Sequence, residues 1–108
     1  MAHFMLQASY APGAVKALVG NPQNREDAIR KLIESMGGKL NSFHFAFGEF
    51  DVVMIAEFPD ATTAASVALA TASSGALSKF QTTTLMTASE GMEAMRKAKT
   101  ASYSPPTG

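Results

Sequence analysis

The sequence contains no cysteine, which excludes disulfide bonds, thiolate metal sites and thiol catalysis. Charged residues are few: they make up 17% of the chain, against about 25% in an average globular protein. Equal numbers of basic and acidic side chains leave no net charge, which argues against a nucleic-acid partner or an anionic membrane surface. Because a surface poor in charge is commonly covered by another chain, we expect a homo-oligomer.

Long hydrophobic runs are missing as well. Residues 61–78 carry no charge, but they are largely Ala, Ser and Thr and cannot replace the ~20 strongly apolar residues that a bilayer core requires. The first seven residues lack the basic region of a secretory signal. We therefore expect a soluble, cytoplasmic protein with no membrane partner.

The 108 residues match one domain, expected at 1–100, followed by a tail at 101–108 that contains two adjacent prolines. Alternation with period two predicts strands, and apolar spacing of i, i+3, i+4, i+7 predicts helices. Caps and turns set the boundaries: Asn21 with Pro22, Gly37-Gly38, Gly48, Asp60, Gly75, and Thr87 with Glu90. The patterns predict strands at 3–10, 39–47, 51–58 and 77–86, and helices at 22–36, at 61–74 and after 87. Residues 11–20 are expected to link the first strand and helix, with one helical turn.

The order β-α-β-β-α-β plus a terminal helix is that of an α+β, ferredoxin-like fold with a four-stranded antiparallel sheet. Both internal helices must pack on one face of that sheet. Beneath them we expect the apolar sides of the first two strands: Phe4, Leu6, Ala8, Phe43, Phe45 and Phe47. The opposite face receives His3, Met5, Gln7, Ser42 and His44. That face is too apolar for water and too polar for a plain core, so we expect it to pair with a second copy around a partly polar cavity.

The hairpin Phe47-Gly48-Glu49-Phe50-Asp51 resembles that of the GYD domain family, small bacterial proteins named for a Gly-x-Tyr-Asp type hairpin. Two further segments are similar to the same family. They are the helix-to-strand junction at 37–40 and the last strand at 82–85, which is followed by a Ser-Glu helix start. The likeness therefore spans about residues 4–99. One departure is Phe50, which stands where the family has Tyr. The resemblance implies a ferredoxin-like fold that assembles as a dimeric α/β barrel. It does not imply an activity, and any cofactor remains unknown.

The two histidines, His3 and His44, are candidates for chemistry because they share the non-helix face. With Glu57 or Asp51 they would form a set suited to zinc, copper or iron. In this fold the third strand usually separates their strands, so we expect the rings about 10 Å apart and any joint metal site to need a second copy. The alternative is a strand-end His3 and a hydrogen-bonded His44.

Asp51 follows the hairpin and can be interpreted in two ways. It is either a ligand or general base, or a carboxylate that accepts N–H groups of the turn or the neighbouring strand. Glu57 can be interpreted as a carboxylate paired with it or as a solvated residue at a strand end.

The sequence has no phosphate-binding loop, no pair of histidines on a helix and no nucleophile elbow, so no known catalytic motif selects a function. Three functions remain open. The first is a homo-oligomer that binds a small molecule through His44, Gln7, Ser42, His3 and Asp51. The second is a small α/β-barrel enzyme that uses His44 with Asp51 or Glu57. The third is a structural or assembly module in which the non-helix face is only an interface.

Overall fold

The computed structural model describes residues 1–107, so Gly108, the last residue of the expected tail, lies outside the described residues. A four-stranded antiparallel sheet of order β2-β3-β1-β4 forms its centre. The strands are β1 (Ala2–Tyr10), β2 (Lys39–Phe45), β3 (Val52–Phe58) and β4 (Leu77–Leu85). The helices are α1 (Pro12–Gly20), α2 (Arg25–Ser35), α3 (Ala61–Ala72) and α4 (Ala88–Lys99). The predicted ferredoxin-like α+β fold is confirmed.

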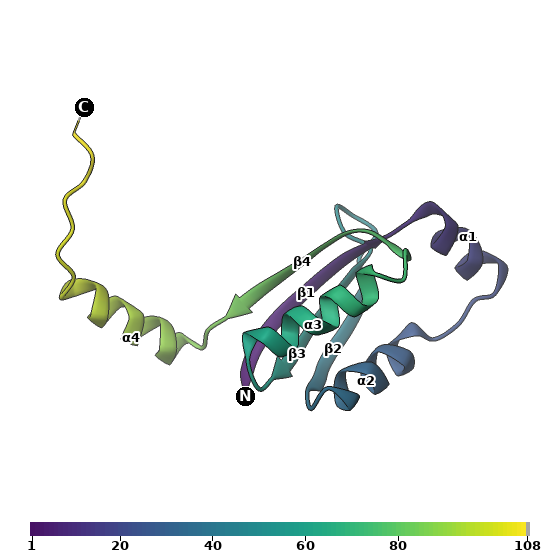
Figure 1. Cartoon of the computed structure of the whole chain (residues 1–108), viewed down its shortest axis with the longest axis horizontal. Helices are drawn as coiled ribbons and strands as arrows, with labels where there is room; N and C mark the ends of the chain where they lie inside the picture. Colours follow the sequence, from purple (N-terminus) through teal and green to yellow (C-terminus); the bar gives the residue numbers. More distant parts are fainter. Residues whose placement is uncertain (108) are drawn as a thin grey trace.

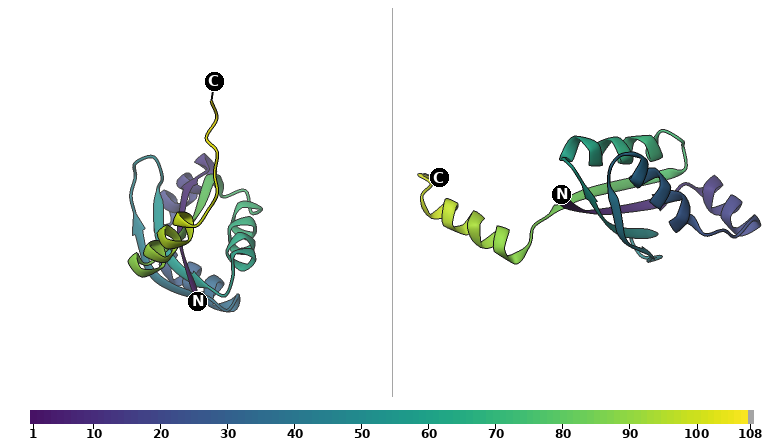
Figure 2. Two further views of the ribbon diagram at one scale, coloured as in Figure 1. Left: turned by 90° about the vertical axis from the view of Figure 1, so that its left-hand side faces the viewer. Right: turned by 90° about the horizontal axis from the view of Figure 1, so that it is seen from below.

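Helices α2 and α3 pack on one face of the sheet, whereas α4 projects away from its end (Figure 1). The view from below in Figure 2 shows the same separation, with α4 beyond the end of the sheet. None of the described helices is long and apolar enough to cross a membrane.

The core lies between the sheet and these two helices. Phe58 and Ile33 are its largest fully buried side chains, from β3 and α2. The rings of Phe4 and Phe58 pack with centroids 5.9 Å apart, and Val67 joins them from α3. Period-two alternation therefore predicted correctly which side of β1 is buried.

Helix caps fix most of the boundaries. The Asp60 carboxylate accepts the N–H of Thr63 at the start of α3, and Thr87 and Glu90 form the predicted capping box of α4. Gly75 has a φ of +80°, the left-handed conformation expected after α3. These signals are local, which is why the sequence predicted them.

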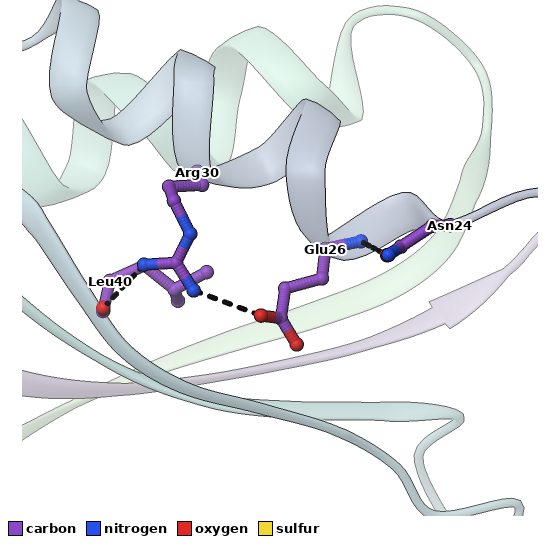
Figure 3. A network of polar contacts seen from close by, with 4 residues as sticks. All are labelled: Asn24, Glu26, Arg30 and Leu40. Atoms are coloured by element: carbon purple, nitrogen blue, oxygen red, sulfur yellow. Dashed lines mark hydrogen bonds and ion pairs between the residues drawn. The ribbon is translucent and has the colours of Figure 1, made fainter.

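The start of α2 differs from the prediction. The cap is Asn24, whose side chain accepts the N–H of Glu26, and not Asn21 (Figure 3). Pro22 precedes the helix, while the proline in a first helical turn is Pro12 of α1. The expected linker at 11–20 is thus a full helix, although no side chain caps its start.

Arg30 anchors α2 to the sheet. Its Nη1 donates to the backbone oxygen of Leu40 at 3.1 Å, and its Nη2 lies 2.9 Å from Oε2 of Glu26 (Figure 3). The first bond joins α2 to the start of β2, so the helix covers only that end of the strand.

Strand β2 is shorter and less regular than predicted. The pairing with β3 shifts between Leu40 and Ser42, so the strand bulges there and Leu40 joins the buried core. Phe45 is 46% exposed and Phe47 is 76% exposed, because both lie beyond the end that α2 covers. In the hairpin it is Phe47, and not the neighbouring Gly48, that has a positive φ, at 52°. The prediction that Phe45 and Phe47 are buried beneath the helices was wrong.

Candidate functional site

The open sheet face is the side of the sheet opposite α2 and α3. Strand pairing aligns its side chains in rows across the strands. One row contains His44, Val53, Gln7 and Gln81. The next row contains Ser42, Ile55, Met5 and Thr83. The face therefore mixes apolar side chains with amide, hydroxyl and imidazole groups at its centre.

Three of the predicted site residues meet in these central rows, and two do not. Gln7 on β1 and Ser42 on β2 are half-buried, and His44 on β2 is exposed. Their two strands flank β3. His3 lies at one end of the face and Asp51 at the other. A single copy of the chain therefore gathers only part of the predicted set.

The two histidines are further apart than predicted. Strand β3 does lie between their strands, but His44 is in the row of Gln7, four residues along β1 from His3. Two strand spacings and four residue rises separate them by roughly 16 Å. His3 instead faces Glu57, with Nε2 3.5 Å from Oε1. Among residues 1–107 no group of three His, Asp or Glu side chains could hold a metal ion.

Asp51 forms hydrogen bonds with the backbone of the neighbouring strand, as expected if its role is structural. Its Oδ2 accepts the N–H of Tyr10 at 2.9 Å, and its own N–H donates to the oxygen of Ala8 at 2.9 Å. Asp51 directly precedes β3, whereas Glu57 lies near the other end of that strand, six residues further along the chain and ~20 Å away. The structure therefore favours the structural interpretation of Asp51 over a carboxylate pair with Glu57.

A cavity of about 320 Å³ lies on the other side of the sheet, between α2, α3 and the strands. Most of its lining is apolar, contributed by Leu6, Ile29, Leu32, Met54, Val67 and Ala68 among others. Arg25 and Tyr10 also line it and are half-buried. We term it the helix-side cavity. The sequence analysis did not predict this cavity. The available signal was the spacing of Arg25, Ile29 and Leu32, which places all three on the same side of α2.

The polar groups of the helix-side cavity influence one another. Burial raises the pKa of Tyr10, an effect that the positive charge of Arg25 opposes and the negative charge of Asp51 increases. Arg25 donates from Nη1 to Oε1 of Gln23 at 3.0 Å. Within residues 1–107 Arg25 forms no ion pair.

A second, more open hollow of about 520 Å³ lies beneath α1. Val15 and Val19 of the helix face Phe45 and Phe47, whose rings stack with centroids 5.5 Å apart. Tyr10 lines both hollows. The two exposed phenylalanines therefore stack on each other beneath α1 and are not covered by α2.

The sheet order and the two helices on one face define a ferredoxin-like α+β domain. A family model described as GYD domain matches residues 4–95, and the chain belongs to this family. A search of curated proteins found no similar sequence. Among solved structures, the crystal structure of MtbAldR is similar, with a TM-score of 0.52 and 16% identity over 80% of this chain. The match covers 52% of that chain, about half its length, and it shows a shared fold.

Proposed function

We propose that this chain is a homo-oligomeric, small-molecule-binding protein whose open sheet faces pair around a partly polar cavity. The observation that carries the proposal is the composition of the open sheet face. Met5, Val53 and Ile55 are half-buried at its centre, beside Gln7 and Ser42. Two such faces packed about 10 Å apart would remove the apolar side chains from water and enclose the polar ones.

The projecting helix α4 supports self-association. The radius of gyration is 17.3 Å, against ~13 Å for a compact domain of this length. No residue of α4 is buried, and Met92 and Met95 are 49% and 72% exposed. Leu85 at the end of β4 pairs with His3, so α4, which follows from Ala88, begins at the His3 end of the open sheet face. The pKa of Glu90 in its first turn is lowered mainly by the capping bonds with Thr87 and further by His3. The side of α4 that carries Met92 and Met95 is apolar and is not covered by its own domain. Such a side is suited to contact a second copy.

The central rows supply the chemistry of the proposed binding site. The Gln7 amide can both donate and accept, as can the Ser42 hydroxyl and the His44 imidazole. Val53 and Ile55 between them provide apolar contact. Such a combination fits a small molecule with a few polar groups better than a highly charged one.

An enzyme that uses His44 with Asp51 or Glu57 is less well supported. The carboxylate of Asp51 accepts the backbone N–H of Tyr10, and Glu57 faces His3 at the end of the sheet. Neither shares the row of His44, so a base and its orienting carboxylate are not assembled within one chain.

We predict that Ile55→Glu disrupts assembly. A carboxylate at the centre of the paired faces would lose its hydration, and a central interface residue commonly contributes ~2–4 kcal/mol. The dissociation constant should therefore rise about 30- to 1,000-fold, measured by analytical ultracentrifugation over a concentration series. The matched control is Leu69→Glu, because Leu69 is exposed on α3 in the other layer. Unchanged assembly of the Ile55 variant would contradict pairing through this face.

Substitution of His44 tests binding separately from assembly. Native mass spectrometry of protein purified without chelator should show extra, stoichiometric mass on the oligomer. His44→Ala should lose that mass and keep the subunit count, because His44 contributes a polar group and little apolar area. His3→Ala, at the end of the face, is the control that should retain the mass. A wild-type oligomer of bare chains would instead favour the assembly-module alternative.

A further inference from the structure

The helix-side cavity is a candidate binding site that the open sheet face does not include. We propose that it binds a small monocarboxylate with an apolar aromatic or branched body, whose carboxylate pairs with Arg25. The site lies on the opposite side of the sheet from the face of the proposed function, so it does not depend on assembly.

The walls suit an apolar body. Leu6 and Met54 form the floor on the sheet, Ile29 and Leu32 line it from α2, and Val67 lines it from α3. The volume of about 320 Å³ is at the lower end of the ~300–1,000 Å³ typical of small-molecule sites. A ligand with one ring or one branched chain is therefore a better match than a nucleotide or a lipid.

Arg25 supplies the charge that selects an anion. It is half-buried, its side chain hydrogen-bonds the neutral side chains of Gln23 and Tyr10, and it forms no ion pair among residues 1–107. A guanidinium presents two parallel N–H donors that match a carboxylate, and partial removal from water strengthens the pairing. The Tyr10 hydroxyl lines the same cavity and stays protonated, since burial raises its pKa, so it can donate a second hydrogen bond.

The number of charges limits the ligand to a single negative charge. Arg25 is the one charged residue in the lining drawn from residues 1–107. Asp51, whose negative charge acts on Tyr10, would repel a dianion such as phosphate. One cation beside an apolar hollow is complementary to a monocarboxylate.

The experiment uses the full chain and two probes of similar shape, phenylacetate and the neutral 2-phenylethanol. Calorimetry should show phenylacetate binding at least tenfold more tightly than 2-phenylethanol. With ¹³C-methyl-labelled methionine, the probe should shift the signal of Met54 in the cavity and leave that of Met92 on α4 unchanged.

Substitutions then assign the charge and the cavity. Arg25→Met should weaken phenylacetate binding at least tenfold and leave 2-phenylethanol binding within twofold. Lys31→Met removes the same charge from an exposed position of α2 and should change neither. Ala68→Leu, which fills the cavity, should weaken both probes. Thermal unfolding of each variant verifies that it folds, and Arg25→Lys, which keeps the charge but not the fork, should bind phenylacetate with intermediate affinity.

Four results would overturn the proposal. They are phenylacetate binding that Arg25→Met does not weaken, equal affinity for the two probes, no shift of Met54 at millimolar probe, and binding that requires deletion of residues 87–108. The last would mean that α4 of another copy occupies the cavity. Failure here is distinct from failure of the proposed function, because Ile55→Glu and His44→Ala should leave phenylacetate binding unchanged.

Discussion

Replacement of Phe58 by Ala should lower the free energy of unfolding by ~3–5 kcal/mol. Phe58 is fully buried on β3 and packs against Phe4, so truncation removes a large apolar side chain and leaves a cavity. Because a domain of this kind is stable by only about 5–15 kcal/mol, the variant should unfold at much lower urea concentration. Equilibrium urea unfolding, followed by circular dichroism, measures the change.

The matched control for this prediction is Phe47→Ala, the same chemical change at a side chain that is 76% exposed. It should cost about 1 kcal/mol or less, since this exposed ring loses mainly its stacking on Phe45. Equal costs at the two positions would contradict the assignment of the core to the helix side of the sheet.

Gly38→Ala should be the second most damaging single change. A Cβ at Gly38 would lie 2.7 Å from the backbone oxygen of Glu57, 2.7 Å from Cδ1 of Phe58 and 2.9 Å from Cγ2 of Ile33. The strand and the two core side chains would have to move, which costs ~1–3 kcal/mol or more. The same urea titration measures it.

Two neighbouring controls separate crowding from backbone strain. Gly37→Ala should cost ~1–2 kcal/mol, because its φ of +78° disfavours a side chain although its surroundings have room. Gly13→Ala should be within ~0.5 kcal/mol of wild type, as nothing lies within 4 Å of its added Cβ. If Gly38→Ala were as mild as Gly13→Ala, the close approach of α2 to β3 at this junction would be wrong.

The fold could be predicted where the signals are local. Alternation on β1 identified its buried side, and Thr87 with Glu90 identified the start of α4. The helix α1 was predicted as a single turn and not as a full helix, because no side-chain cap marks its start. The bulge near Asn41 was missed because it depends on how β2 pairs with β3 and not on the sequence of β2 alone.

The candidate site was harder to predict because it depends on register and on the spacing between layers. Strand parity placed His3 and His44 on one face, but only the pairing through β3 shows how far apart they lie. The cavity beside Arg25 forms between residues that are distant in the sequence, and periodicity indicates which side of a helix faces the sheet but not the gap between two helices.

The isolated position of α4 has a further consequence. The helix has 12 residues, and a free helix of that length is only marginally stable in water. Its capping box and the basic last turn of Arg96, Lys97 and Lys99 favour it, but no buried contact does. In the proposed oligomer the folding of α4 would be coupled to its contact with the second copy. Ordering its residues would oppose that contact, which would make the attachment weaker and more readily reversible than its area suggests.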